Sequence, residues 1–123
     1  MHKRFLTPLL SALLVAGSLP ARAADDVIRI GVLNDQSGLY SDFGGATSVI
    51  AARMAVEDFG GKVLGKPIEI LSADHQNKAD VATSVARRWF DVDGVSAVAD
   101  LTNSAVALAV QQLAKGQGKV TLS

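Results

Sequence analysis

The stretch "VIRIGVLNDQSGLYSDFGGATSVIAARMAVEDFGG" (residues 27–61) decides the fold class. It opens with residues 27–33, which are rich in Val, Ile and Leu and typical of a strand. A polar loop follows, and then apolar residues recur at helical spacing on one face, at Val49, Ala52, Ala55, Val56 and Phe59. The stretch therefore predicts a strand, a long loop and an amphipathic helix.

The rest of the chain repeats this alternation. Strand-like segments recur at 67–73, 95–100 and 119–123. A second helix is indicated by the stripe Ala82, Val85, Ala86 and Trp89, and a third by residues 105–110, which are apolar all round and hence either buried or covered by something outside this chain. Strands that alternate with helices pair in parallel through right-handed crossovers, so we expect an α/β fold with a doubly wound parallel sheet.

Local signals place the helix ends and one surface pair. Gly60 and Gly61 are expected to end the first helix, and Asn77 to cap a helix that starts near Lys78. Arg53 and Glu57 lie four residues apart on the outer face of the first helix, where such side chains can pair.

Three polar loops follow the predicted strands: "NDQSGLYSDFGG" (34–45), "DHQNK" (74–78) and "DLTNS" (100–104). The first is longer than the about 2–6 residues that join a strand to a helix in α/β units. Ligands of open parallel sheets bind at the carboxyl ends of the strands, where all three loops would meet. The sequence therefore predicts a binding site at this edge.

The third loop leads into an alanine-rich helix. Thr102, Asn103 and Ser104 precede that helix, and free N–H groups around Ser104 and Ala105 would suit a carboxylate. The alternative is ordinary N-capping by Asn103 or Ser104. In the first loop, Tyr40 and Phe43 either pack on the body of a ligand or cover the top of the core.

Other candidates for chemistry are weaker. Asp35 and Asp42 are interpreted as turn formers. Asp74 and His75 could form an acid/base or metal pair, but the other histidine is His2, in the predicted leader, so a solvated loop is favoured for both. The chain has no cysteine, and it lacks the G-x-G-x-x-G, P-loop and G-x-S-x-G motifs. We therefore expect no catalytic residues, no metal and no cofactor.

Residues 1–23 have the layout of a secretory signal peptide, with a basic start, an apolar stretch and an Ala21-Arg22-Ala23 cleavage motif. A membrane anchor is disfavoured because prolines and hydroxyl residues interrupt the apolar stretch. Cleavage before Ala24 would leave nine basic and twelve acidic side chains, a balance that disfavours nucleic-acid binding. We expect export with cleavage of this segment.

The chain resembles a known family in four segments. They read "IRIGVLNDQSGLYSDFG", "AARMAVEDFGG", "LGKPIEILSADHQNKADVA" and "GVSAVADLTNSAVALAV", with the pattern S-G-x-x-x-x-[FW]-G at Ser37 to Gly44. Over residues 26–123 they resemble the N-terminal lobe of the periplasmic solute-binding proteins of ABC transporters, in the branched-chain amino-acid-binding (leucine-binding) family. The resemblance implies part of lobe one of a type I periplasmic binding protein fold.

The resemblance also implies a function. The protein would be the substrate-binding component of an ABC importer, not an enzyme, and would deliver a small carboxylate-bearing solute (amino acid, amide or aromatic acid) to permease subunits in the inner membrane. Tyr40 and Phe43 would pack on the solute, while Asn103, Ser104 and the N–H of Ala105 would receive its carboxylate.

Two departures from the family stand out. Where amino-acid-binding members commonly carry a disulfide between two loops, this chain has His75 and Thr102. Family members are also several times longer, so we expect residues 24–123 to be the N-terminal part of the ligand-binding lobe, in truncated form. The alternatives from the sequence are a stand-alone small periplasmic α/β sensor module or an enzyme.

Overall fold

The computed structural model describes residues 26–123, and the predicted signal peptide lies outside them. The elements in order are β1 (Ile28–Asn34), the 3-10 helix η1 (Ser41–Phe43), α1 (Gly45–Asp58), β2 (Lys62–Val63), β3 (Lys66–Asp74), α2 (Ala79–Asp91), β4 (Val95–Ala99), α3 (Ser104–Gly116) and β5 (Val120–Leu122). The predicted strands and helices are therefore confirmed.

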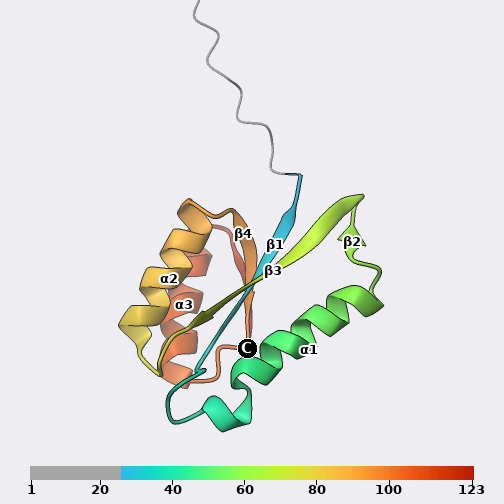
Figure 1. Cartoon of the computed structure of the whole chain (residues 1–123). Helices are drawn as coiled ribbons and strands as arrows, with labels where there is room; N and C mark the ends of the chain where they lie inside the picture. The colour runs from blue at the N-terminus through green and yellow to red at the C-terminus, as the bar shows by residue number, and fades with distance from the viewer. Residues whose placement is uncertain (1–25) are drawn as a thin grey trace, which may run out of the picture.

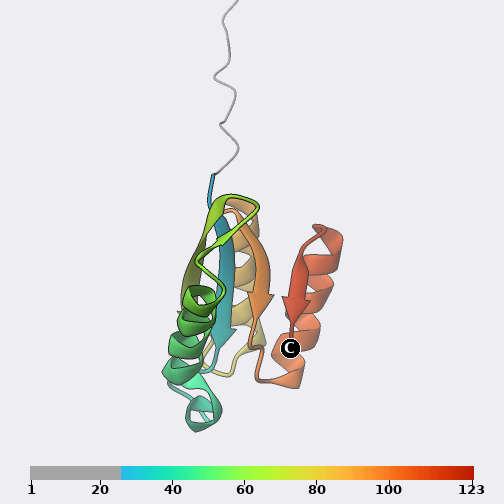
Figure 2. The ribbon, with the colours of Figure 1, turned by 90° about the vertical axis from the view of Figure 1, so that its right-hand side faces the viewer.

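The strands form one sheet in the order β2-β3-β1-β4-β5, with β1 at its centre. The pairs β1–β3, β1–β4 and β4–β5 are parallel, whereas β2 pairs with β3 in an antiparallel hairpin that the sequence interpretation missed. Helix α1 lies on one face of the sheet, and α2 and α3 lie on the other (Figures 1 and 2). The doubly wound α/β prediction is confirmed.

The main core lies between the sheet and the helices α2 and α3. Its buried members are Leu33, Ala82, Ala86, Trp89, Phe90, Val95, Val98, Leu101, Val106, Val110 and Ala114. The Trp89 ring packs against the backbone of β1 at Gly31, so closely that a Cβ atom at this position would overlap the ring. A glycine at this position of the central strand is thus required for the contact between Trp89 of α2 and the sheet.

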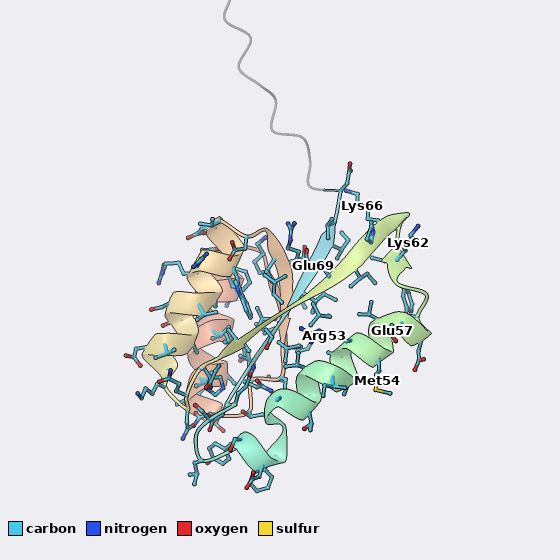
Figure 3. All side chains as sticks on the ribbon, viewed as in Figure 1. Arg53, Met54, Glu57, Lys62, Lys66 and Glu69 are labelled. Carbon is cyan, nitrogen blue, oxygen red and sulfur yellow. The ribbon has the colours of Figure 1, made fainter. Side chains whose placement is uncertain are left out.

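The opposite face of the sheet is less completely covered. The apolar stripe of α1 faces Ile30, Ile68 and Ile70, as its spacing predicts, but leaves a hollow of about 370 Å³ between helix and sheet. Phe59 at the rim is 67% exposed, and Met54, also exposed, points away from the sheet (Figure 3).

Two other features of the helices differ from what their sequences suggest. No ion pair joins Arg53 and Glu57 in residues 26–123, so the predicted surface pair does not form. Helix α3 buries Val106, Val110 and Ala114 but leaves Leu108 68% exposed, so this helix is not buried all round within the described part of the chain.

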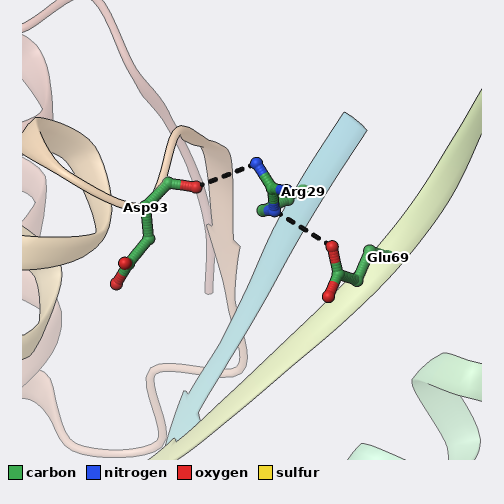
Figure 4. Close-up of polar contacts among 3 residues, drawn as sticks. All are labelled: Arg29, Glu69 and Asp93. Atoms are coloured by element: carbon green, nitrogen blue, oxygen red, sulfur yellow. Dashed lines mark hydrogen bonds and ion pairs between the residues drawn. The ribbon is translucent and has the colours of Figure 1, made fainter. Parts of the chain in front are cut away.

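The amino ends of the strands are tied together by Arg29. Its Nε atom donates to the Glu69 carboxylate on β3 at 3.0 Å, and a terminal nitrogen donates to the Asp93 carbonyl before β4 at 3.2 Å (Figure 4). This contact lies at the opposite edge of the sheet from the three polar loops.

The start of α2 corrects a prediction. Asn77 does not cap this helix, because the N-cap position belongs to Lys78, which makes no side-chain cap. Asn77 instead has a left-handed backbone with a φ of 56°, a conformation that Asn tolerates better than most residues. Its side chain is engaged elsewhere, as described below.

Candidate functional site

The carboxyl ends of β1, β3 and β4 meet at one edge of the sheet, at the lower end of the molecule in Figure 1. The loops that leave this edge cover residues 35–40, 75–78 and 100–103, and η1 adds a short helical turn to the first of them. The three polar loops singled out in the sequence thus lie together.

Two carboxylates shape the first loop. Asp35 is fully buried, and its two oxygens accept the backbone N–H groups of Gly38 and Tyr40 at 2.7 and 2.8 Å. This geometry confirms the interpretation of Asp35 as a turn former. A Cβ atom on Gly38 would lie 2.6 Å from Asp35 Oδ1, so the turn requires a glycine there.

Asp74, the last residue of β3, supports the same loop from the side. Its carboxylate accepts the backbone N–H groups of Gln36 and Gln76 and the hydroxyl of Ser37. Desolvation raises the pKa of Asp74, but these hydrogen bonds and the neighbouring His75 outweigh it and hold the pKa below its usual value. The carboxylate therefore stays ionised and keeps the loop in place.

Tyr40 and Phe43 lie next to each other in this loop. Their ring centroids are 6.2 Å apart with an interplanar angle of 55°, a tilted arrangement favourable for aromatic pairs. Phe43 is 83% exposed and Leu39 75% exposed, whereas Tyr40 is half-buried. The pair therefore presents an apolar surface to solvent at the carboxyl edge, and only Tyr40 contributes much cover to the fold.

Asn103 is the N-cap of α3. Its Oδ1 atom accepts the N–H groups of Ala105 at 2.8 Å and Val106 at 3.1 Å, and its Nδ2 atom donates to Asn77 Oδ1 at 2.6 Å. Ser104 is exposed at the first position of the helix. The ordinary capping alternative is therefore realised by Asn103, and a carboxylate that took the Ala105 N–H would have to displace the Asn103 side chain.

A buried polar contact joins the first and third loops. Asn34, at the end of β1, is fully buried, and its Nδ2 atom donates to the Gly45 carbonyl at 2.6 Å and to Asp100 Oδ2 at 2.8 Å. Sequence reasoning missed this residue, although a polar Asn ending an apolar strand was a signal. Asn34 fixes the start of α1 relative to the loop after β4.

The interpretation of His75 as part of a solvated loop is wrong. His75 directly follows β3, its side chain is fully buried, and its backbone N–H donates to the Asn34 carbonyl at the end of β1 at 2.9 Å. Burial lowers the pKa of His75 below its usual value of about 6.5, although the carboxylates of Asp35, Asp74 and Asp100 act in the opposite direction. The ring is therefore neutral at pH 7.

No group of three potential metal ligands occurs in residues 26–123. The buried His75 has Nδ1 engaged by the Asn77 N–H at 3.0 Å, and Nε2 has no partner. Within the same residues, no helix is long and apolar enough to cross a membrane.

Comparison with known proteins identifies similar chains. A family model described as periplasmic binding protein matches residues 27–123. A crystal structure of a periplasmic binding protein from Burkholderia mallei matches with a TM-score of 0.77 and 51% identity, over 80% of this chain and 26% of that chain. No curated protein matches the chain.

Two further structures extend the comparison. A branched chain amino acid ABC transporter periplasmic ligand-binding protein from Burkholderia xenovorans matches with a TM-score of 0.74 and 50% identity, over 76% of this chain and 25% of that chain. A solute binding protein from Rhodopseudomonas palustris, in complex with 3,4-dihydroxybenzoic acid, shares the fold at a TM-score of 0.72 and 21% identity, over 80% of this chain and 27% of that chain. The chain thus spans about a quarter of the length of these proteins.

Proposed function

The chain belongs to the periplasmic binding protein family, and we propose that residues 24–123 form the N-terminal part of the ligand-binding lobe of an ABC importer's substrate-binding component. In this proposal the carboxyl edge of the sheet is one wall of a solute cleft, and a second lobe provides the other wall. The protein works in the periplasm and passes its solute to permease subunits of the inner membrane. It is a binding protein and performs no catalysis.

The observation that carries the proposal is the construction of the carboxyl edge. Buried Asn34 and Asp35 and half-buried Asp74 hold the loops in fixed positions, while the surface they support displays exposed aromatic and hydroxyl groups. Pre-formed apolar surface with a few placed polar groups is typical of small-molecule sites. A chain that used this edge only for folding would have no need to expose Phe43 there.

The solute proposed is a small carboxylate-bearing molecule, such as an amino acid, an amide or an aromatic acid. Ser104 lies at the positive end of the α3 dipole, which favours an anion, and Tyr40 with Phe43 offers packing for an apolar or aromatic body. The Rhodopseudomonas palustris protein of the same fold binds 3,4-dihydroxybenzoic acid, and the Burkholderia xenovorans protein is described as a branched chain amino acid transporter component. Asn103 and the Ala105 N–H join the carboxylate contact once the solute displaces the cap.

The test is a chimera in which residues 26–123 replace the matching segment of the Burkholderia mallei protein, which supplies the second lobe. Calorimetric titration with branched-chain amino acids, their amides, benzoate and 3,4-dihydroxybenzoate should identify at least one ligand. A folded chimera that binds no member of the panel would contradict the proposed solute class.

A substitution at Ser104 tests the carboxylate contact. In the chimera, Ser104→Ala removes a hydrogen bond to a charged group, which contributes about 1.5–3 kcal/mol, so affinity should fall roughly tenfold or more. Ser96→Ala is the matched control, since Ser96 is exposed near the start of β4, at the other edge of the sheet. If calorimetry gives the same solute affinity for both variants, Ser104 does not contact the carboxylate of the solute.

Export is tested on the protein in cells. If residues 1–23 are a signal peptide, mass spectrometry of periplasmic material should give a mature N-terminus at or near Ala24. Retention of Met1 on a membrane-bound species would contradict this expectation.

A further inference from the structure

Hydrogen bonds of side chains and backbone link three residues, His75, Asn77 and Asn103, in a continuous line at the carboxyl edge of the sheet. The backbone N–H of Asn77 donates to His75 Nδ1 at 3.0 Å, Asn103 Nδ2 donates to Asn77 Oδ1 at 2.6 Å, and Asn103 Oδ1 accepts the first free N–H groups of α3. The line runs from the fully buried ring of His75 to the exposed helix start that carries Ser104.

We propose that His75 is a positioning residue whose neutral ring, through Asn77 and Asn103, holds the start of α3 in place, and that protonation of His75 loosens this wall of the cleft. The proposal rests on the proposed function in so far as the wall binds a solute. Its structural part, the link from His75 to α3, stands on the hydrogen bonds alone.

The contacts of the neutral His75 ring select one of its two tautomers. Because Nδ1 accepts the Asn77 N–H, the proton of the neutral ring lies on Nε2. A second proton would have to bind Nδ1, where it would face an N–H donor in place of an acceptor. Nε2 has no partner in the structure, so protonation places a charge in a buried position and costs Nδ1 its hydrogen bond from the Asn77 N–H.

The charged groups around His75 do not remove this conflict. Asp35 from the loop after β1, Asp74 from β3 and Asp100 from the loop after β4 all favour the protonated ring electrostatically. Two of these carboxylates are engaged by backbone N–H groups, and Asp100 accepts from Asn34. The Lys78 ammonium donates to Gln76. Desolvation outweighs the three carboxylates and a hydrogen bond of the ring to its own backbone, which also favours the protonated form, so the pKa of His75 is lowered.

The sign of the pH dependence follows from this lowered pKa. In the unfolded chain His75 titrates near 6.5, and in the folded chain below that value. The stability contributed by the neutral ring is therefore fully present above about pH 6.5 and is lost as the pH falls through the folded pKa. Asp74, whose pKa is also lowered, loses its contribution only below about pH 4, so the two effects are separable.

The first experiment measures thermal unfolding of the 123-residue chain between pH 7.5 and 5.5 at low protein concentration. The only other histidine is His2, outside the described residues, so a fall in Tm over this range reports His75. The variant His75→Asn keeps an acceptor near the Nδ1 position but does not titrate, and its Tm should be nearly constant over the same range. An equal fall in both proteins would overturn the proposal.

The second experiment needs no variant at His75. Nitrogen NMR of the imidazole should show the Nε2–H form at pH 7.5, and amide exchange at Ala105 and Val106, corrected for intrinsic rates, should accelerate as the ring titrates. Asn77→Gly keeps the left-handed backbone and removes Oδ1, so exchange at both amides should be raised at every pH. If protection of these two amides from exchange is unchanged in Asn77→Gly and does not depend on the titration of His75, the line of hydrogen bonds does not hold the start of α3 in place.

The third experiment tests whether the line of hydrogen bonds from His75 to α3 affects solute binding. In the chimera, affinity for the solute identified by titration should fall several-fold from pH 7.5 to 5.5, and His75→Asn should abolish most of that fall. An equal fall in solute affinity in both chimeras would show that His75 does not act on the binding site. A chimera that binds no solute would contradict the proposed function, whereas Tm and amide exchange would still decide the role of His75.

Discussion

Replacing Trp89 by Ala is expected to leave little folded protein at 25 °C. The Trp89 ring is 6% exposed and packs on the backbone of the central strand at Gly31, in the middle of the only extensive core of residues 26–123. Removal of a buried Trp costs about 3–5 kcal/mol, and a domain of this size has a total stability near the lower end of about 5–15 kcal/mol. The loss is therefore comparable with the whole stability of the chain.

Circular dichroism during urea or thermal unfolding measures this effect. Val92→Ala is a suitable control, because Val92 directly follows α2 and is 62% exposed, so its substitution should change stability by less than about 0.5 kcal/mol. A Trp89→Ala protein that melts within a few degrees of the wild type would mean that the sheet does not depend on this contact.

The strands and helices of this fold could be predicted because they follow from local periodicity. The apolar run at 27–33 and the apolar spacing from Val49 to Phe59 indicate β1 and α1 without reference to other parts of the chain, since the spacing alone specifies which face is buried. The β2–β3 hairpin was missed because Lys62 and Val63 form too short a strand to show any period.

The meeting of the three polar loops at one edge of the sheet was predictable for a different reason. Parallel strands bring their carboxyl ends together whatever their sequence, so the polar loops had to meet. The polar scaffold beneath them was not predictable. His75 lies in a run of polar residues that looks solvated, and its burial depends on loops that are distant in the sequence and close only in the fold.

The prediction that Asn77 caps α2 failed for a related reason. Asn77 has the right residue type and the right position, but its Oδ1 atom accepts from Asn103 and its backbone is left-handed. A contact between residues 26 positions apart outweighed a local preference. Asn77 thus departs from its local preference because it joins two loops of the proposed solute wall.

Residues 24–123 alone are expected to bind solute at a Kd of roughly millimolar or weaker, against roughly micromolar for a chimera that encloses the same solute. Small-molecule sites bury about 70–90% of the ligand surface. The carboxyl edge of the sheet offers one wall, so Tyr40, Phe43 and Ser104 can cover a solute from one side only.

The isolated chain is also expected to self-associate. The edge strand β5 exposes Val120 and Leu122, and the hollow between α1 and the sheet is lined by apolar side chains, with Phe59 exposed at its rim. Unpaired edges and contiguous apolar surface both favour association. Light scattering should therefore show species larger than a monomer that grow with concentration, while calorimetry with the chimera's solute should show weak or no binding. A monomer with a cooperative melt and micromolar affinity would show that this part of the lobe is a complete binding domain, because the second wall would then contribute little to the affinity.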